Sequence, residues 1–296
     1  MDVNKWNTRV LAHPFQYHSP TTVEEACSLL SELEGAMAFA GGTDLIPKAK
    51  QALIRPRHLV NLKRIPELTG IREEDGLVWI GAATKLRALE KSKLVSERLP
   101  LLHQAVSSIG SVQIRNMGTL GGNVCNASPA ADGALALVAL GAEVEVAGAS
   151  ERRSHPIEEF FRGPGKTILE RGELVVGFRV RPHDGYGQRF TSIGRMSLDI
   201  STVSVAAALK RRGDRVEEAR LAMGSVAPIP LRLHGVEEYL RGRVLDDGVV
   251  WRAAELASQE IRPITDIRGT AEYRREACKG LVMDALKACW LEAGVE

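Results

Sequence analysis

Two glycine-centred segments contain the residues best suited to holding an anion. The first is Ala40-Gly41-Gly42-Thr43-Asp44, and the second is Thr119-Leu120-Gly121-Gly122-Asn123, which continues to Asp132. Glycine adopts positive φ angles and lets a ligand approach the main chain closely. Successive backbone N–H groups then form a concave nest for anionic oxygens, with no need for lysine or arginine. We therefore predict that the two segments together bind a buried diphosphate.

Polar side chains beside the glycines add to this predicted site. The hydrogen-bond donors are Thr43, Thr119, Asn123, Asn126 and Ser128, and the acceptors for sugar hydroxyl groups are Asp44 and Asp132. Taken singly, each segment also fits an ordinary turn, because Gly-Gly and Asn-Xaa-Ser are common in turns. Neither segment has the P-loop or Rossmann pattern, so those nucleotide-binding folds lose support.

The elements before the first segment follow from local signals. Thr22-Val23-Glu24-Glu25 is a capping-box pattern and predicts a helix that runs to about residue 34. A strand over residues 36–40 would then deliver the first glycine segment. Asp44 and Pro47 would start the next helix and place its positive end near a phosphate.

Later elements alternate between strands and helices up to residue 182. We predict strands at 58–62, 77–82, 143–147 and 174–180, and helices at 99–109 and 134–140. The second glycine segment would emerge after the helix at 99–109. Residues 183–187 are polar and glycine-bearing, which is typical of a domain boundary.

The remainder of the chain predicts an antiparallel sheet followed by helices. The strands are expected at 189–193, 202–210 and 216–223, with Arg212-Gly213-Asp214 turning the last pair. The helices are expected at 236–241, 249–260 and 271–292. In the last one Ala277, Leu281, Ala285 and Cys289 recur every four residues and define a packing face.

Composition indicates a globular protein with room for about two domains. The chain has 296 residues, of which 44% are hydrophobic, and its 39 basic and 37 acidic residues leave a net charge of +2. No strong basic surface is expected, so we predict no nucleic-acid partner. Neither a long apolar run nor a charged leader is evident, which predicts no membrane span and a cytoplasmic location.

No catalytic or metal-binding constellation stands out in the sequence. Cys27, Cys125, Cys278 and Cys289 lack the short spacings of iron-sulfur ligands, and Cys27 and Cys289 fall on helical patterns as small buried residues. The seven histidines form no HxH or HExxH group, and no GxSxG motif is present. We therefore predict neither a metal site nor catalytic side chains in this chain.

Taken together, the two segments resemble a known family. Residues 39–45 and 119–132 closely resemble the FAD-binding medium subunit of molybdenum hydroxylases, which include carbon monoxide dehydrogenase and xanthine dehydrogenase. The resemblance extends from Phe15-Gln16-Tyr17 through residues 111–116 to Asp199-Ile200-Ser201. It implies an α+β fold: a vanillyl-alcohol-oxidase-type FAD-binding domain over 1–182, split into α/β subdomains of about 1–62 and 63–182. The C-terminal domain, 183–296, would be an antiparallel sheet with helices.

The resemblance also implies which residues contact FAD. The first segment would wrap the diphosphate and ribityl chain, and it comprises Phe39, Ala40, Gly41, Gly42, Thr43, Asp44 and Leu45. The second segment would hold the other side through Thr119, Gly121, Gly122 and Asn123. Sugar or ribityl oxygens would be met by Asn126, Ser128 and Asp132. Ile109 and Gly110 would lie beside the flavin, and Val175 would lie against the adenine or the ring.

Two positions depart from the family pattern. Thr191 follows Phe190 where xanthine dehydrogenase-like chains have a lysine facing the flavin, and Arg195-Met196 replaces an Arg-Arg pair. The redox potential of the flavin and its oxidant are therefore not predicted. Tyr186 could stack on the flavin ring or anchor the surface, and Arg195 with Asp199 could form a structural pair or a partner contact.

The implied function is electron transfer within a larger enzyme. A large subunit with a molybdenum cofactor would oxidise the substrate, a small subunit would carry two 2Fe-2S clusters, and FAD in this chain would pass electrons to an external acceptor. The flavin ring would face the iron-sulfur subunit, and the assembly would be a dimer of heterotrimers. The substrate and the acceptor are not readable from this chain. Two alternatives stay open: a self-contained flavin oxidase or dehydrogenase, and a non-catalytic interaction protein with a flavin fold.

Overall fold

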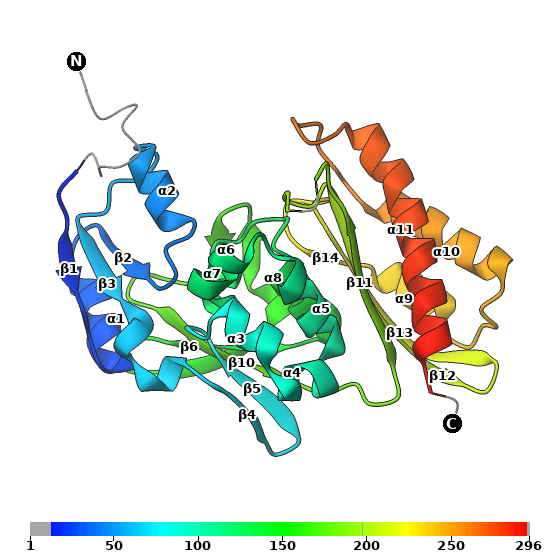
Figure 1. The fold of residues 1–296 in the computed structure, drawn as a ribbon, viewed down its shortest axis with the longest axis horizontal. Helices are drawn as coiled ribbons and strands as arrows, with labels where there is room; N and C mark the ends of the chain where they lie inside the picture. Colours follow the sequence, from blue (N-terminus) through cyan, green and yellow to red (C-terminus); the bar gives the residue numbers. More distant parts are fainter. Residues whose placement is uncertain (1–12, 197, 295–296) are drawn as a thin grey trace.

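The computed structural model describes residues 13–196 and 198–294. Three parts follow one another along the molecule: a small sheet near the N-terminus, a central sheet covered by helices, and a C-terminal sheet with helices (Figure 1). This arrangement confirms the mixed helix-and-sheet class predicted from the sequence. Within the described residues, no helix is both long and apolar enough to cross a membrane.

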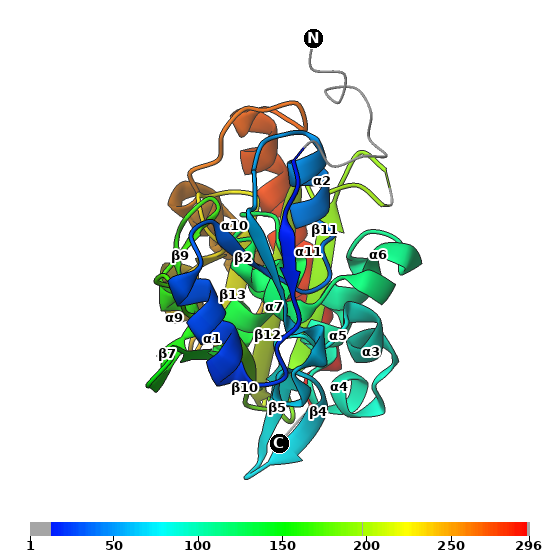
Figure 2. The same ribbon diagram turned by 90° about the vertical axis from the view of Figure 1, so that its left-hand side faces the viewer.

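The N-terminal part is a parallel three-stranded sheet with strand order β1-β3-β2. Its strands are β1 (Gln16–His18), β2 (Ala36–Phe39) and β3 (His58–Asn61). Helix α1 (Val23–Glu32) starts with the predicted capping box, since Thr22 Oγ1 accepts from the Glu25 N–H at 3.2 Å. Figure 2 shows β1 and α1 in front of the rest of the molecule.

The central part is an antiparallel five-stranded sheet with order β4-β5-β10-β6-β7. Its strands are β4 (Ile71–Glu74), β5 (Leu77–Gly81), β6 (Glu143–Ala147), β7 (Arg152–Pro156) and β10 (Leu174–Val180). Its helices are α3 (Leu86–Lys91), α4 (Lys93–Arg98), α5 (Pro100–Ser108), α6 (Val112–Met117), α7 (Leu120–Cys125) and α8 (Asp132–Leu140). A two-stranded hairpin, β8 (Phe161–Gly163) with β9 (Lys166–Thr167), completes this part.

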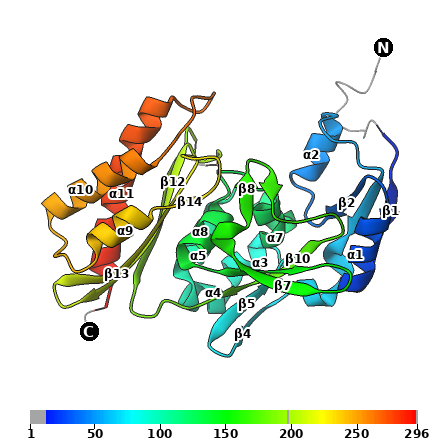
Figure 3. The same cartoon turned by 180° about the vertical axis from the view of Figure 1, so that it is seen from behind.

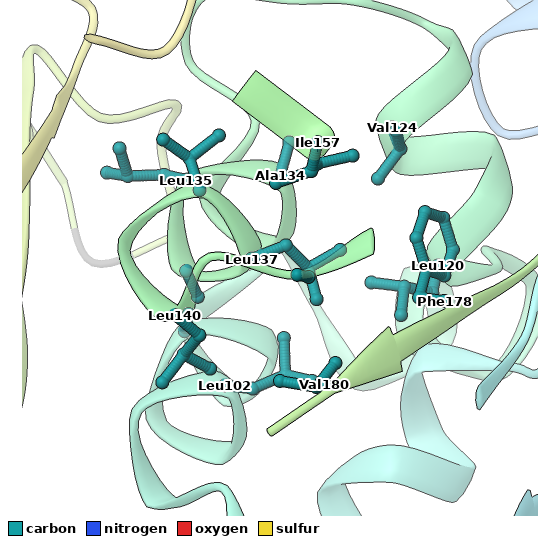
Figure 4. Close-up of a cluster of buried hydrophobic side chains, with 14 of the residues drawn as sticks. Leu102, Leu120, Val124, Ala134, Leu135, Leu137, Leu140, Ile157, Phe178 and Val180 are labelled. Atoms are coloured by element: carbon teal, nitrogen blue, oxygen red, sulfur yellow. The ribbon is translucent and has the colours of Figure 1, made fainter. Parts of the chain in front are cut away.

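Helix α8 forms the centre of the main hydrophobic core. Every residue of α8 is buried, because its sequence is apolar on all sides. Leu135, Leu137 and Leu140 of α8 belong to one buried cluster with Leu120 of α7 and Phe178 of β10 (Figure 4). Gly141 ends the helix in the left-handed conformation, with φ of 63°, which favours glycine. The core thus fixes α7, which carries the second glycine segment, against the central sheet.

The C-terminal part is an antiparallel sheet with order β11-β12-β13-β14. Its strands are β11 (Gly187–Ile193), β12 (Val203–Arg212), β13 (Arg215–Gly224) and β14 (Leu231–Arg232). Helices α9 (His234–Leu240), α10 (Asp247–Glu260) and α11 (Ala271–Glu292) cover the face that points away from the central part (Figures 1 and 3). The predicted strands, helices and the turn at Gly213 are confirmed here.

The opposite face of this sheet packs on the central part. Ala206 of β12 and Ala222 of β13 belong to the same buried cluster as α5 and α8. Polar contacts also cross this junction: Gln188 Oε1 accepts from the Leu101 N–H at 3.2 Å, and Gln104 Oε1 accepts from the Phe190 N–H at 2.9 Å. The two parts are therefore joined by both apolar packing and buried hydrogen bonds.

Candidate flavin-binding site

A cavity of about 370 Å³ lies where the N-terminal and central parts meet. Both glycine segments line it, together with a residue of β10. The predicted site residues on its wall are Phe39, Ala40, Gly41, Gly42, Thr43, Asp44, Leu45, Ile109, Thr119, Gly121, Gly122, Asn123, Asn126 and Val175. Segments about 80 residues apart in the sequence thus share one concave surface, as the diphosphate hypothesis requires.

The first segment turns sharply as it leaves β2. Gly42 has φ of 71°, and an added Cβ would lie 2.5 Å from the Phe39 ring. Both facts favour glycine at this position. The N–H groups of Gly41, Gly42, Thr43 and Asp44 donate no hydrogen bond to any described residue, so they are available to an anion.

Gly41 brings the first segment against the chain that precedes the second. A Cβ on Gly41 would overlap the Met117 carbonyl oxygen and lie 2.7 Å from the Gly118 Cα. Only a residue without a side chain permits this approach. The close packing of Gly41 on residues 117–118 holds the first segment beside the start of the second.

The second segment is not the open loop that the sequence predicted but the short helix α7. Thr119 is its N-cap, and its Oγ1 accepts from the Gly122 N–H at 3.1 Å. The Gly121 N–H donates to the Ala82 carbonyl at 2.8 Å, and the Asn123 N–H donates to the Thr119 carbonyl at 3.0 Å. The prediction of a second nest of free N–H groups is therefore wrong for residues 121–123, because these N–H groups already donate to Thr119 and Ala82.

Gly121 has a packing role in addition to its place on the cavity wall. A Cβ there would lie 2.6 Å from the Ala82 carbonyl oxygen, so glycine lets α7 sit directly on the end of β5. Asn123 Oδ1 accepts from the Ala134 N–H at 3.2 Å and ties α7 to the first turn of α8. These contacts hold α7 rigidly at the edge of the cavity.

A polar bridge crosses from the first segment to the end of α7. Lys48 of α2 (Leu45–Lys50) donates from Nζ to Asn126 Oδ1 at 2.7 Å, and Asn126 Nδ2 donates to Asp44 Oδ1 at 3.2 Å. All three side chains line the cavity. The bridge connects the N-terminal part to the central part beside the predicted diphosphate position.

Three predicted site residues lie outside the cavity wall: Gly110, Ser128 and Asp132. Ser128 Oγ accepts from the Ala130 N–H at 3.2 Å. Asp132 is buried where α8 meets the C-terminal sheet, and Ser201 Oγ donates to its Oδ1 at 3.3 Å. Burial raises the pKa of Asp132 to about 7, although the hydrogen bond from Ser201 opposes this rise.

Tyr186, which was considered as a flavin neighbour, and the pair Arg195 and Asp199 also lie off the cavity wall. Tyr186 donates its hydroxyl to Glu218 at 2.7 Å, and its ring packs edge-on to His183 at 4.9 Å. Tyr186 therefore anchors the domain junction. Arg195 and Asp199 form an ion pair of 2.9 Å, which agrees with the structural interpretation of that pair.

Some wall residues were not predicted from the sequence. They are Ala38, Lys48, Ile54, Leu62, Ala82, Ala83, Leu86, Ile114, Gly118, Cys125, Leu169, Glu173 and Leu174. For Lys48 the signal was present, because it follows Asp44 by four residues on the predicted helix and so shares its face. The apolar members come from several elements and carry no local pattern that would group them.

Within residues 13–196 and 198–294, no group of three or more histidine, cysteine or acidic side chains could hold a metal ion. The four cysteines are free, and burial raises the pKa of each thiol. The chemistry of this site therefore depends on what the cavity binds.

Family models match both halves of the chain. Residues 13–182 match the FAD binding domain in molybdopterin dehydrogenase, and residues 188–289 match the CO dehydrogenase flavoprotein C-terminal domain. The fold and the cavity thus define an FAD-binding flavoprotein. The chain belongs to the FAD-binding medium subunits of the molybdenum hydroxylase family, and it is a subunit of an oxidoreductase.

Individual relatives agree over nearly their whole lengths. The carbon monoxide dehydrogenase medium chain of Hydrogenophaga pseudoflava is 37% identical over 93% of this chain and 97% of its own. The xanthine dehydrogenase FAD-binding subunit of Escherichia coli O157:H7 is 33% identical over 94% of this chain and 97% of its own. A solved structure of the Hydrogenophaga pseudoflava carbon monoxide dehydrogenase, lacking the Mo-pyranopterin moiety of its cofactor, superposes with a TM-score of 0.93. It is 36% identical and covers 95% of this chain and 98% of the other.

Proposed function

We propose that this chain is the FAD-carrying electron-transfer subunit of a heteromeric molybdenum hydroxylase. It would take electrons from 2Fe-2S clusters of a partner subunit and pass them through FAD to an external acceptor. The observation that carries the proposal is the meeting of both glycine segments on one cavity. Bound FAD supplies the redox chemistry, and the protein supplies binding, orientation and electrostatics.

The residues on the cavity wall fit a dinucleotide diphosphate. The N–H groups of residues 41–44 donate to no described residue and so offer four donors, and Gly42 turns the chain here with a left-handed φ of 71°. Thr43, Asn123 and Asn126 would add side-chain hydrogen bonds, and Val175 and Ile109 would supply apolar contacts. The wall residues predicted from the sequence are thus proposed as the FAD ligands.

The predicted residues outside the wall are also proposed as FAD contacts, with Gly110 beside the flavin and Ser128 and Asp132 at sugar or ribityl oxygens. Gly110 and Ser128 lie within two residues of the wall residues Ile109 and Asn126. Asp132 has less support, since its carboxylate is buried and already accepts from Ser201. If it contacts a ribityl hydroxyl, that hydroxyl would compete with Ser201.

The finer architecture and assembly are part of the same proposal. We propose a vanillyl-alcohol-oxidase-type FAD-binding domain over 1–182, with subdomains of about 1–62 and 63–182, and a flavoprotein domain over 183–296. The family-model boundaries at 182 and 188 support the division. The partners would be a small subunit with two 2Fe-2S clusters and a large subunit with the molybdenum cofactor, as a dimer of heterotrimers. The names of relatives as medium chains support partner subunits. Cytoplasmic location stays a prediction of the sequence.

Purification of the native complex tests the proposal. We expect this chain to co-purify with two other subunits and with FAD, iron and molybdenum. We also expect the isolated chain to bind FAD without oxidising organic substrates. An isolated chain that oxidises such a substrate would favour the self-contained flavin enzyme, and a chain that binds no FAD would favour the non-catalytic alternative.

A further inference from the structure

Lys48 is the one lysine or arginine on the cavity wall within the described part of the chain. The other ionisable groups there are Asp44, Glu173 and Cys125. Glu173 is paired with Arg153, with Nη2 and Oε2 2.8 Å apart, and burial raises the pKa of the Cys125 thiol to about 12, so the thiol stays neutral. Among the residues that the structure describes, Lys48 is therefore the single positive side chain on the cavity wall.

The present contact of Lys48 is with a neutral group. Its Nζ donates to the Asn126 amide oxygen at 2.7 Å, and it forms no ion pair with any described residue. An ammonium group hydrogen bonds more strongly to an anionic oxygen than to an amide. If Lys48 Nζ replaced its hydrogen bond to Asn126 with one to a phosphate oxygen, the stronger hydrogen bond would favour ligand binding.

The position of Lys48 matches the charge of the proposed ligand. A diphosphate carries about two negative charges, and the backbone donors of residues 41–44 lie at the N-terminal side of the same short helix. Asp44 adds a negative charge to this wall. Without Lys48, no positive side chain on the described cavity wall would offset Asp44, and only the backbone N–H groups and neutral polar side chains would bind the diphosphate.

We propose that Lys48 binds the diphosphate of FAD directly and exchanges its contact with Asn126 for one with a phosphate oxygen. This inference rests on the proposed function, because it requires FAD in the cavity. Lys48 would set the affinity for the cofactor through its charge, and the affinity would therefore fall as ionic strength rises.

The test measures FAD binding to the apo-protein by fluorescence titration at low and high salt. For K48M we expect a dissociation constant about 10- to 100-fold higher than wild type at low salt, the size of a lost charged hydrogen bond. We also expect K48M to lose most of the salt dependence, and K48R to retain it. K50M is the matched control, because Lys50 lies on the same helix but not on the cavity wall, and it should bind as wild type does.

Thermal unfolding of each apo-variant separates binding from folding, and K48Q replaces K48M if the latter is destabilised. A dissociation constant for the Lys48 variant within twofold of wild type, with unchanged salt dependence, would overturn this inference and leave the proposed function standing. A wild-type protein that binds no FAD would instead overturn the proposed function itself.

Discussion

Among single residues, Gly41 and Asp132 show best what the sequence can and cannot predict about the site. Gly41 could be predicted as part of a binding segment. Its close packing on the Met117 carbonyl could not, because Met117 lies 76 residues later in the sequence and no local sequence pattern links the two positions. Asp132 was predicted to contact the cofactor, and the structure buries it at the domain junction instead of on the cavity wall. Sequence identifies such residues by type, whereas only the tertiary fold decides what they touch.

Replacement of Gly41 by alanine should separate the two segments. The new methyl group would overlap backbone atoms of residues 117 and 118, which cannot move as a flexible side chain can. We expect a loss of about 1–3 kcal/mol in the free energy of unfolding and weaker FAD binding, measured by denaturant titration and fluorescence. The control is G280A, where no atom lies within 4 Å of the added Cβ in a helix, so stability should stay equal or rise. Equal FAD affinity in G41A and wild type would contradict the role of this contact.

Asp132 should make stability depend on pH. Burial raises its pKa from 3.8 to about 7, so the folded protein binds a proton that the unfolded chain releases between these values. Its contribution to stability is therefore fully present below about pH 4 and is lost as the pH rises to about 7. D132N should remove this part of the pH dependence, measured by unfolding of the apo-protein from pH 4 to pH 8. An unchanged pH profile in D132N would show that Asp132 ionises normally.

Among helices and strands, the sequence pattern predicted the long elements well but did not reveal most of the six-residue helices. The capping box of α1, the strands of the C-terminal sheet and α11 agree closely with the sequence. Helices α3, α4, α6 and α7 were not predicted, because each has only six residues, too few for a period, and α7 contains two glycines that lower helix propensity. Packing of α7 on α8 and β10 overrides that low propensity. The equally short α2 was predicted from its start signals, Asp44 and Pro47.

Gln188 joins the central helices to the first strand of the C-terminal sheet, and its loss should weaken that junction. The change Q188L keeps the size of the side chain but leaves the buried Leu101 N–H without its acceptor. We expect a loss of about 1–3 kcal/mol in unfolding free energy by denaturant titration. The matched control Q259L, at an exposed position of α10, should stay within about 0.5 kcal/mol of wild type. Similar values for the two variants would show that the junction gains nothing from this hydrogen bond.

At the scale of the whole molecule, the cavity exists because separate parts of the chain converge. The fold class, the two-segment site and the family were predicted from the sequence, the last through resemblance. The complete set of wall residues could not be predicted, because it comes from β2, α2, α6, α7 and β10 and follows no regular spacing in the sequence. The C-terminal sheet packs on the central core through Ala206 and Ala222. The cavity lies on the other side of the central part, where it meets the N-terminal part. The proposed cofactor site and the packing surface of the C-terminal sheet thus lie on different faces of the central part.

Hydrogen–deuterium exchange of the apo-protein with and without FAD tests most directly whether both glycine segments bind one cofactor. We expect FAD to slow exchange in peptides covering residues 40–46 and also in those covering 119–126, at the same FAD concentration. Peptides of α10 and α11, which lie away from the cavity, should exchange at unchanged rates. Protection of only one segment, or of neither, would contradict the claim.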